Sequence, residues 1–333
     1  GVNTGFYDGA TATNTKYIEA PMDWADQRIL VNFDGAFKDV VVTLNNHVMG
    51  RHHYGYTPFR VDLTSHMKLG KKNRLSVIVS NDSEPNSRWY PGGGIYRHVH
   101  LLTSPQIHIA PNGIFVHTDH ILNGDAFVIV ETTVENHTSK EAYLWVDCTF
   151  KESGQQESVA RQAIKVYVPA NGSAVARTQM MIENAKLWDI DTPQLYEVSA
   201  QLITARPTDH TEYEIFDEEQ VSLGVRTISM DAKNGFVLNG RSVKLKGGCI
   251  HHDNGILGAA SYYDSEYRKA KLHKDHGYNA LRFAHNPVSS DMLDACDRLG
   301  IVVINEAFDT WNMSKNIHDY CEHFRQEWQA EMK

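Results

Sequence analysis

One stretch of the sequence decides the fold. Residues 243–311 read VKLKGGCIHHDNGILGAASYYDSEYRKAKLHKDHGYNALRFAHNPVSSDMLDACDRLGIVVINEAFDTW. Three short apolar runs alternate there with two segments of helical pattern; the runs are Val243–Leu245 continuing to Cys249-Ile250, Asn279–Phe283, and Ile301–Ile304. Strands and helices that alternate at this spacing are typical of βαβ units, which build a parallel sheet. Such sheets bind ligands at the carboxyl ends of their strands, so we expect any chemistry of this stretch to lie there.

Each apolar run is followed by polar or ionisable side chains. They are His251, His252 and Asp253 after the first run, Arg282, His285 and Asn286 at the end of the second, and Glu306, Asp309 and Trp311 after the third. The carboxyl ends of parallel strands share one edge of a sheet, so these side chains are expected to face one site.

Three segments after residue 227 show helical spacing. Asp264–Gly277 and Ser290–Gly300 each end on a glycine, which is typical of a helix C-terminus, and the second begins with a serine cap. Asp319–Met332 places large apolar side chains four residues apart. The sequence therefore predicts two helices between the strands and a third after them.

The amino-terminal part of the chain, to about residue 105, favours strands alone. The predicted strands are Arg28–Phe33, Asp39–Leu44, His47–Gly50, Leu75–Val79 and Ile95–Leu102. Many short strands without helices between them indicate a β-sandwich or jelly roll.

Residues 106–226 form a second block of strands. Polar turns separate its runs, which are Ile107–Ile109, Phe127–Val134, Ala142–Phe150, Ala163–Val168, Ala174–Met181, Leu195–Leu202 and Glu214–Val221. About seven strands in a block of this length suit an immunoglobulin-like sandwich.

Composition argues against several classes of protein. The net charge is −9 and the pI about 6.0, which disfavours a nucleic-acid partner because phosphate binding needs a basic face. The apolar runs fall short of a membrane span, so no membrane association is expected. Four cysteines without a C-x-x-C pair predict free thiols in a reducing compartment, the cytoplasm. The chain starts at Gly1 rather than at a methionine, which indicates a processed or cut amino end.

Two pairs of adjacent histidines, His52-His53 and His251-His252, are not expected to bind a metal. Neighbouring side chains in a strand point to opposite faces, so neither pair can easily hold one ion.

Several further stretches carry a resemblance to a known family. The most specific reads SRWYPGGGIYR at residues 87–97. The others follow in order along the chain: FDGAF at 33–37, HYGYTPF at 53–59, LWD at 187–189, PQLY at 193–196, GVR at 224–226 and NG at 239–240. Together they resemble glycoside hydrolase family 2, the family of β-galactosidases and β-glucuronidases. NEAFDTW at 305–311 with HHD at 251–253 looks more like the β-galactosidases.

The resemblance implies three domains. They are a jelly-roll, galactose-binding-like domain at residues 1–105, an immunoglobulin-like β-sandwich at 106–226, and the first three βα units of a (β/α)8 TIM barrel at 227–333. The implied activity is that of a retaining exo-glycosidase that hydrolyses terminal β-galactosides. A β-glucuronidase, a β-mannosidase, and a non-catalytic carbohydrate-binding protein built on the same domains stay open as alternatives.

The resemblance also implies that the acting carboxyl groups lie elsewhere. A whole barrel needs roughly 250 residues, and residues 227–333 supply only its first three βα units. The family's general acid follows the fourth barrel strand and its nucleophile follows the seventh, so neither belongs to these three units. We therefore expect no catalytic residue in this chain, and no activity from the chain alone. Glu306 follows the third strand, so we interpret it as a structural carboxylate even though Asn305-Glu306 imitates the family's acid motif.

The strand ends are then predicted to bind substrate. His285 matches the substrate-contacting histidine of the family, and Asn286 beside it is assigned the same role, although a backbone-bonded histidine is the alternative. Asp253 and Asp309 are predicted to accept hydrogen bonds from sugar hydroxyls, or else to lie behind the residues that do so.

Three further side chains have two interpretations each. Trp311 is either a stacking platform for a sugar or a core residue. Arg88, in the glycine-rich loop, either contacts sugar or bridges the domains. Arg282 is expected to brace neighbouring carboxylates rather than to touch sugar.

Cofactor and partners follow from the same resemblance. Magnesium and sodium accompany many β-galactosidases of the family, whereas this sequence shows no cluster of ligands, so no cofactor is expected in the chain itself. The expected partner is a carbohydrate, a β-galactoside. Three barrel strands leave open sheet edges, which predicts a homo-oligomer formed through them.

Overall fold

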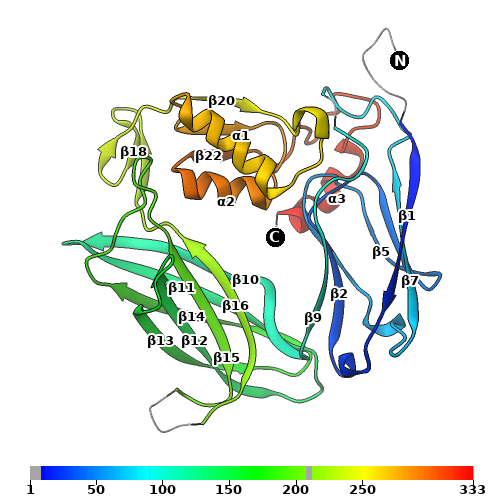
Figure 1. The fold of residues 1–333 in the computed structure, drawn as a ribbon, viewed down its shortest axis with the longest axis horizontal. Helices are drawn as coiled ribbons and strands as arrows, with labels where there is room; N and C mark the ends of the chain where they lie inside the picture. Colours follow the sequence, from blue (N-terminus) through cyan, green and yellow to red (C-terminus); the bar gives the residue numbers. More distant parts are fainter. Residues whose placement is uncertain (1–8, 90, 208–211, 333) are drawn as a thin grey trace. The chain divides into compact units, whose positions relative to one another are not determined.

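The structure, a computed structural model, describes residues 9–89, 91–207 and 212–332 (Figure 1). The chain divides into two compact units. The first comprises residues up to 103, 246–296 and residues from 301 onward, and the second comprises 104–245 and 297–300.

The amino-terminal part of the first unit is a sandwich of short antiparallel strands. Its elements are β1 (Thr11–Glu19), β2 (Arg28–Phe33), β3 (Ala36–Phe37), β4 (Val40–Leu44), β5 (His47–His52), β6 (Phe59–Asp62), β7 (Lys72–Ser80), β8 (Gly94–Ile95) and β9 (Val99–Ser104), with 3-10 turns at Met22–Trp24 and Thr64–His66. The sheets have the orders β1-β7-β4-β5, β6-β2-β9 and β3-β8. Side chains alternate along β4, where Val40, Val42 and Leu44 enter the core between the sheets. These antiparallel sheets around one core confirm the predicted jelly roll.

One predicted strand of this sandwich is wrong. Ile95–Leu102 is two strands, because the chain leaves the sheet between β8 and β9. Tyr96 and Arg97 are both buried there, which the alternating faces of one continuous strand do not allow. The Arg97 guanidinium donates to the carbonyl oxygens of Tyr56 (2.8 Å) and Pro287 (2.8 Å), and these bonds hold the break in place.

The second unit is an immunoglobulin-like sandwich. Its main strands are β10 (Ile107–Leu122), β11 (Asp125–Asn136), β12 (Ala142–Glu152), β13 (Ser158–Val168), β14 (Gly172–Ile182), β15 (Tyr196–Ile203) and β16 (Ile215–Leu223). They pair as β10-β11-β14 and β13-β12-β15-β16 around one apolar core (Figure 1). Five of the seven predicted runs lie wholly in these strands, and the other two begin one residue before β15 and β16. The first is far longer than predicted, because β10 continues through Pro111 and Gly113 with a register shift between Ile109 and Ile114.

A small antiparallel sheet follows in the same unit. It contains β17 (Ile228–Asp231), β18 (Gly235–Leu238) and β19 (Arg241–Ser242), in that order. The sequence did not predict this sheet.

The rest of the first unit contains the parallel sheet that the opening stretch predicts. Strands β20 (Gly247–Ile250), β21 (Ala280–Phe283) and β22 (Val302–Asn305) pair in parallel and in that order. The helices are α1 (Tyr263–Asp275), α2 (Ser290–Leu299) and α3 (Cys321–Glu331), with a 3-10 turn at Gly255–Leu257 (Figure 1). The first part of a TIM barrel is thereby confirmed.

The helix ends follow the local sequence. Gly277 and Gly300 follow α1 and α2 with φ angles of +86° and +68°, the left-handed backbone that glycine adopts at a helix C-terminus. The cap of α2 is Ser289, whose Oγ accepts a hydrogen bond from the Met292 N–H at 3.3 Å. At α3 the Asp319 carboxylate accepts from the Cys321 N–H at 3.0 Å.

Two predictions from composition can be compared with the structure. Cys148, Cys249, Cys296 and Cys321 are all free thiols, as expected. Among the described residues, every helix is too short or too polar to cross a lipid bilayer.

Candidate functional site

Three side chains at the ends of β21 and β22 form one charged cluster. The Arg282 Nε donates to Glu306 Oε1 at 2.5 Å, and His285 Nδ1 lies 3.0 Å from Glu306 Oε2. Both carboxylate oxygens of Glu306 are therefore engaged within the cluster. Arg282 braces a carboxylate, as the sequence predicted.

Aromatic rings lie beside this cluster. Trp89, from the glycine-rich loop before β8, stacks on His251 with ring centres 5.8 Å apart and lies 5.5 Å from the His285 ring. His251 Nδ1 bonds to the Ala284 carbonyl oxygen at 2.7 Å, which fixes its ring at the end of β20. Sequence reasoning missed Trp89 as a site residue, although it lies inside the most specific motif.

His252 and Asn286 form a buried pair behind these rings. Arg97 Nη2 lies 3.4 Å from His252 Nδ1, and His252 Nε2 is hydrogen-bonded to Asn286 Oδ1. Burial, and then the nearby Arg97 charge, lower the pKa of His252 to about 3, so this imidazole is neutral at neutral pH. Because only 1% of Asn286 is exposed, the structure places it behind the surface at the strand ends.

Arg88 and Asp309 bind each other. Arg88 Nη2 lies 2.5 Å from Asp309 Oδ1, and Lys315 Nζ lies 2.8 Å from the same oxygen. Burial by itself would raise the pKa of Asp309, but hydrogen bonds from Arg88 and Lys315 outweigh burial and lower that pKa. Arg88 thus bridges from the jelly-roll loop to the segment after β22, one of its two predicted roles.

Trp311 and Asp253 lie on the surface. Trp311 is 63% exposed, and its indole N–H donates to the Phe308 carbonyl oxygen at 3.2 Å. It lines an apolar groove of about 420 Å³ with Phe308, Phe324, Trp328 and Met332, so it is not a core residue in this structure. Asp253 is exposed after β20, and its backbone oxygen accepts from Lys269 Nζ at 3.1 Å.

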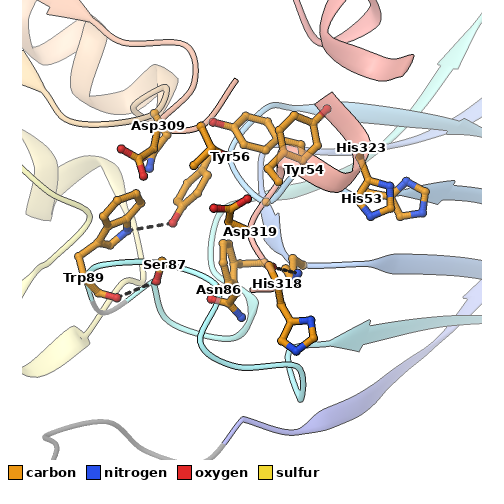
Figure 2. Close-up of a pocket in the computed structure, with 16 residues that line it drawn as sticks. His53, Tyr54, Tyr56, Asn86, Ser87, Trp89, Asp309, His318, Asp319 and His323 are labelled. Atoms are coloured by element: carbon orange, nitrogen blue, oxygen red, sulfur yellow. Dashed lines mark hydrogen bonds between the residues drawn. The ribbon is translucent and has the colours of Figure 1, made fainter. Parts of the chain in front are cut away.

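The loop at residues 86–89 lines a small cavity, and hydrogen bonds around this cavity hold the loop in place (Figure 2). Its volume is about 40 Å³, enough for water and far too small for a sugar ring. The Trp89 indole N–H donates to the Tyr56 hydroxyl at 3.0 Å, and Ser87 Oγ donates to the Trp89 carbonyl oxygen at 2.8 Å. The Tyr54 hydroxyl donates to the Ala307 carbonyl oxygen at 2.7 Å. These bonds attach the jelly-roll loop to the strand ends.

Side chains of metal-ligand type meet in two groups of three among the described residues. One group is Asp39, His53 and His323, and the other is His108, Glu135 and His137. Each has two imidazoles and one carboxylate, whereas magnesium takes six oxygen ligands. Neither group therefore fits magnesium.

Comparisons with known proteins agree with the fold. The model described as "Glycosyl hydrolases family 2, sugar binding domain" matches residues 6–105, "Glycosyl hydrolases family 2" matches 107–226, and "Glycosyl hydrolases family 2, TIM barrel domain" matches 230–332. The chain belongs to glycosyl hydrolase family 2. The predicted order of jelly roll, immunoglobulin-like sandwich and TIM barrel is therefore confirmed.

Family 2 relatives include proteins with two different names. Beta-galactosidase BoGH2A of Bacteroides ovatus is 35% identical over 328 residues, which are 98% of this chain and 38% of that protein. A putative beta-glucuronidase of Formosa agariphila is 31% identical over 334 residues, which are 100% of this chain and 31% of that protein. A family 2 crystal structure from Bacteroides cellulosilyticus superposes with a TM-score of 0.91 at 36% identity, over 97% of this chain and 40% of that one. The chain spans well under half of each relative.

Proposed function

We propose that this chain forms one wall of the sugar site of a retaining exo-β-galactosidase, an enzyme that hydrolyses terminal β-galactosides. The observation that carries the proposal is the cluster of Arg282, His285 and Glu306 at the carboxyl ends of β21 and β22, with Trp89 against it. The similarity to a protein named beta-galactosidase supports the choice of substrate.

His285 is the central sugar-binding residue of the proposal. Its Nδ1 is occupied by Glu306, so its other ring nitrogen is the one that a sugar hydroxyl meets. That nitrogen accepts a hydrogen bond in the neutral imidazole and donates one in the imidazolium. A fixed ring orientation lets the hydrogen bond strengthen as the hydroxyl gains charge in the transition state.

The other predicted residues divide into two groups. Asp253 and Trp311 are exposed and contact sugar directly, the first by accepting hydroxyl hydrogens and the second by packing on the C–H face of the ring. Arg88 and Asp309 act as a bonded pair that offers its remaining oxygen and N–H groups to hydroxyls. Asn286 acts indirectly, by holding His252.

The acting carboxyl groups are proposed to come from outside this chain. A retaining glycosidase needs two of them about 5–5.5 Å apart, one as proton donor and one as nucleophile. Glu306 is assigned neither role, because one carboxyl group cannot fill both and its two oxygens are bonded to Arg282 and His285. The 333-residue polypeptide should therefore be inactive by itself.

A β-glucuronidase is the second candidate, favoured by the relative that carries that name. A glucuronide presents a carboxylate, which needs a cation. Arg282, Arg88 and Lys315 are each bonded to a protein carboxylate, and this pairing favours the uncharged galactoside.

The test compares nitrophenyl β-galactoside, β-glucuronide and β-mannoside as substrates of the full-length gene product that contains this chain. A kcat/KM highest for the galactoside supports the proposal, and a higher value for either other substrate contradicts it. Galactose binding without turnover of any of the three would instead identify a carbohydrate-binding protein.

A further inference from the structure

The immunoglobulin-like sandwich, in the second compact unit, contains a cluster of metal-ligand side chains of its own. His108 on β10 faces Glu135 on β11 across the antiparallel ladder, and His137 follows directly after β11. The candidate ligand atoms of these three side chains all lie within 4.8 Å of one another. The cluster is thus formed by strand register within one unit.

His108 is oriented as metal-binding histidines are. Its side chain is 1% exposed, and its Nδ1 lies 2.9 Å from the Pro105 carbonyl oxygen. A carbonyl oxygen only accepts, so Nδ1 carries the hydrogen and Nε2 carries the lone pair. A backbone carbonyl on the second ring nitrogen is the usual support of a metal-bound imidazole.

The spacing of the ligand atoms matches a tetrahedral ion. Glu135 Oε2 lies 3.5 Å from His108 Nε2 and 2.9 Å from His137 Nε2, and the two imidazole centres are 5.4 Å apart with their planes 14° apart. Zinc bonds of about 2.0–2.1 Å place neighbouring ligand atoms roughly 3.3 Å apart and ring centres roughly 5 Å apart. The three side chains therefore need little movement to hold an ion.

We propose that His108, Glu135 and His137 bind a transition-metal ion of the zinc type. Two imidazoles and one carboxylate suit Zn²⁺ and disfavour Mg²⁺ or Ca²⁺, which take oxygen ligands. Three protein ligands leave a fourth position for water. The ion reaches the site from solvent, because the side chains of His137 and Glu135 are 36% and 33% exposed.

The second group of ligands in the chain lacks this geometry. The His53 and His323 rings lie face to face, with centres 4.1 Å apart and planes 2° apart. Parallel rings with centres this close must overlap face to face, so their in-plane lone pairs do not converge on one ion. The His108 and His137 rings are also nearly parallel, but their centres are 5.4 Å apart, a separation that allows them to lie side by side around an ion. His53 Nδ1 is also bonded to Glu327 at 2.7 Å. The two groups therefore give opposite expectations.

A bound ion would fasten the start of β10 to the end of β11. The His137 N–H already donates to the Gln106 carbonyl oxygen at 2.9 Å, next to the turn that carries Pro105. The ion would add a second, side-chain link at the same place. This structural role is independent of the proposed glycosidase activity.

The test is zinc titration of the metal-free 333-residue protein by calorimetry, with Co²⁺ absorption as a reporter of tetrahedral coordination. We expect one Zn²⁺ per chain and no heat with Mg²⁺. His137→Ala should weaken zinc affinity at least 10-fold and abolish the Co²⁺ band. His137 is chosen because a half-exposed side chain after the strand can be truncated without loss of the fold, which circular dichroism checks.

Two variants serve as controls. His120→Ala removes an exposed histidine of the same strand β10, and His323→Ala removes one member of the stacked pair. Both should leave zinc affinity unchanged. The proposal is overturned if the folded His137→Ala protein binds zinc as tightly as the parent, if His323→Ala instead loses the ion, or if the parent binds none.

Discussion

The immunoglobulin-like sandwich and the ends of the parallel sheet are built on opposite principles. The sandwich encloses one apolar core, to which Val146, Phe150 and Leu202 contribute fully buried side chains. The ends of β21 and β22 carry a guanidinium, an imidazole and a carboxylate in mutual contact at the surface. Core packing supplies stability, whereas exposed ion pairs contribute little to it. The second region is therefore suited to function, and substitutions should separate the two.

The largest expected effect on stability is in the sandwich. Phe150→Ala removes a fully buried ring on β12 and should lower the free energy of unfolding by about 3–5 kcal/mol. Urea denaturation measures the change. Tyr143→Ala on the same strand, where the ring is 57% exposed, should cost less than about 1 kcal/mol. If both variants lost the same free energy of unfolding, burial in the core would not explain the stability of the sandwich.

At the ends of β21 and β22, a substitution is expected to lower activity and to leave stability almost unchanged. His285→Ala in the full-length gene product should lower kcat/KM for nitrophenyl β-galactoside roughly 10²-fold or more, because a hydrogen bond that strengthens in the transition state is lost. The midpoint of thermal unfolding should change little. His120→Ala, an exposed histidine of the sandwich, is the control and should alter neither quantity. Normal kcat/KM in His285→Ala would remove this residue from the site.

The docking of α3 should depend on pH. Burial raises the pKa of Glu331 to about 7, opposed by its hydrogen bond with Thr57. The folded state therefore holds this proton more tightly than the unfolded state, in which the pKa is about 4.3. Stability from this group is complete below that value and is lost as pH rises toward 7.

Hydrogen exchange of α3, corrected for the intrinsic rate, measures this dependence. Protection should fall between pH 5 and pH 7.5 in the parent and stay level in Glu331→Gln. The neighbouring His52 responds in the opposite sense, since burial lowers its pKa to about 4. An unchanged pH dependence in Glu331→Gln would assign the effect to another group.

The smallest expected effect is weak self-association. The open edges of the three-stranded parallel sheet are predicted to pair with a second copy of this chain. The groove that contains Trp311, Trp328 and Met332 exposes apolar side chains that add to this tendency. Light scattering should show a mean mass that rises with protein concentration, and Trp328→Glu should suppress the rise. A constant monomer mass across the concentration range would contradict this proposal.

Much of the fold was predictable because its determinants are local. The alternation of apolar runs with glycine-ended helical segments gave the parallel sheet and its helices, and β-branched runs gave most strands of the sandwich. Errors arose where tertiary contacts overrule local pattern. The break between β8 and β9 depends on Arg97 bonding to Tyr56 and Pro287, and β10 continues through a proline and a glycine that normally indicate a turn.

The candidate site was less predictable, because its contacts join distant segments. Arg88 and Asp309 are separated by 221 positions, so their pairing cannot be predicted from their spacing in the sequence. Trp89 reaches His251 and His285 only through the folded loop. The facing positions of His108 and Glu135 required the register of β10 and β11.

The role of this chain as one wall of a sugar site is tested most directly by nitrophenyl β-galactoside hydrolysis by the 333-residue chain, measured beside the full-length gene product. The chain is expected to supply sugar-binding residues without the acting carboxyl groups. The full-length protein should therefore release nitrophenol, while the chain alone should not exceed the buffer rate. Turnover by the chain that survives repeated purification, and that is lost in Glu306→Gln, would show that Glu306 is a catalyst and would contradict the account.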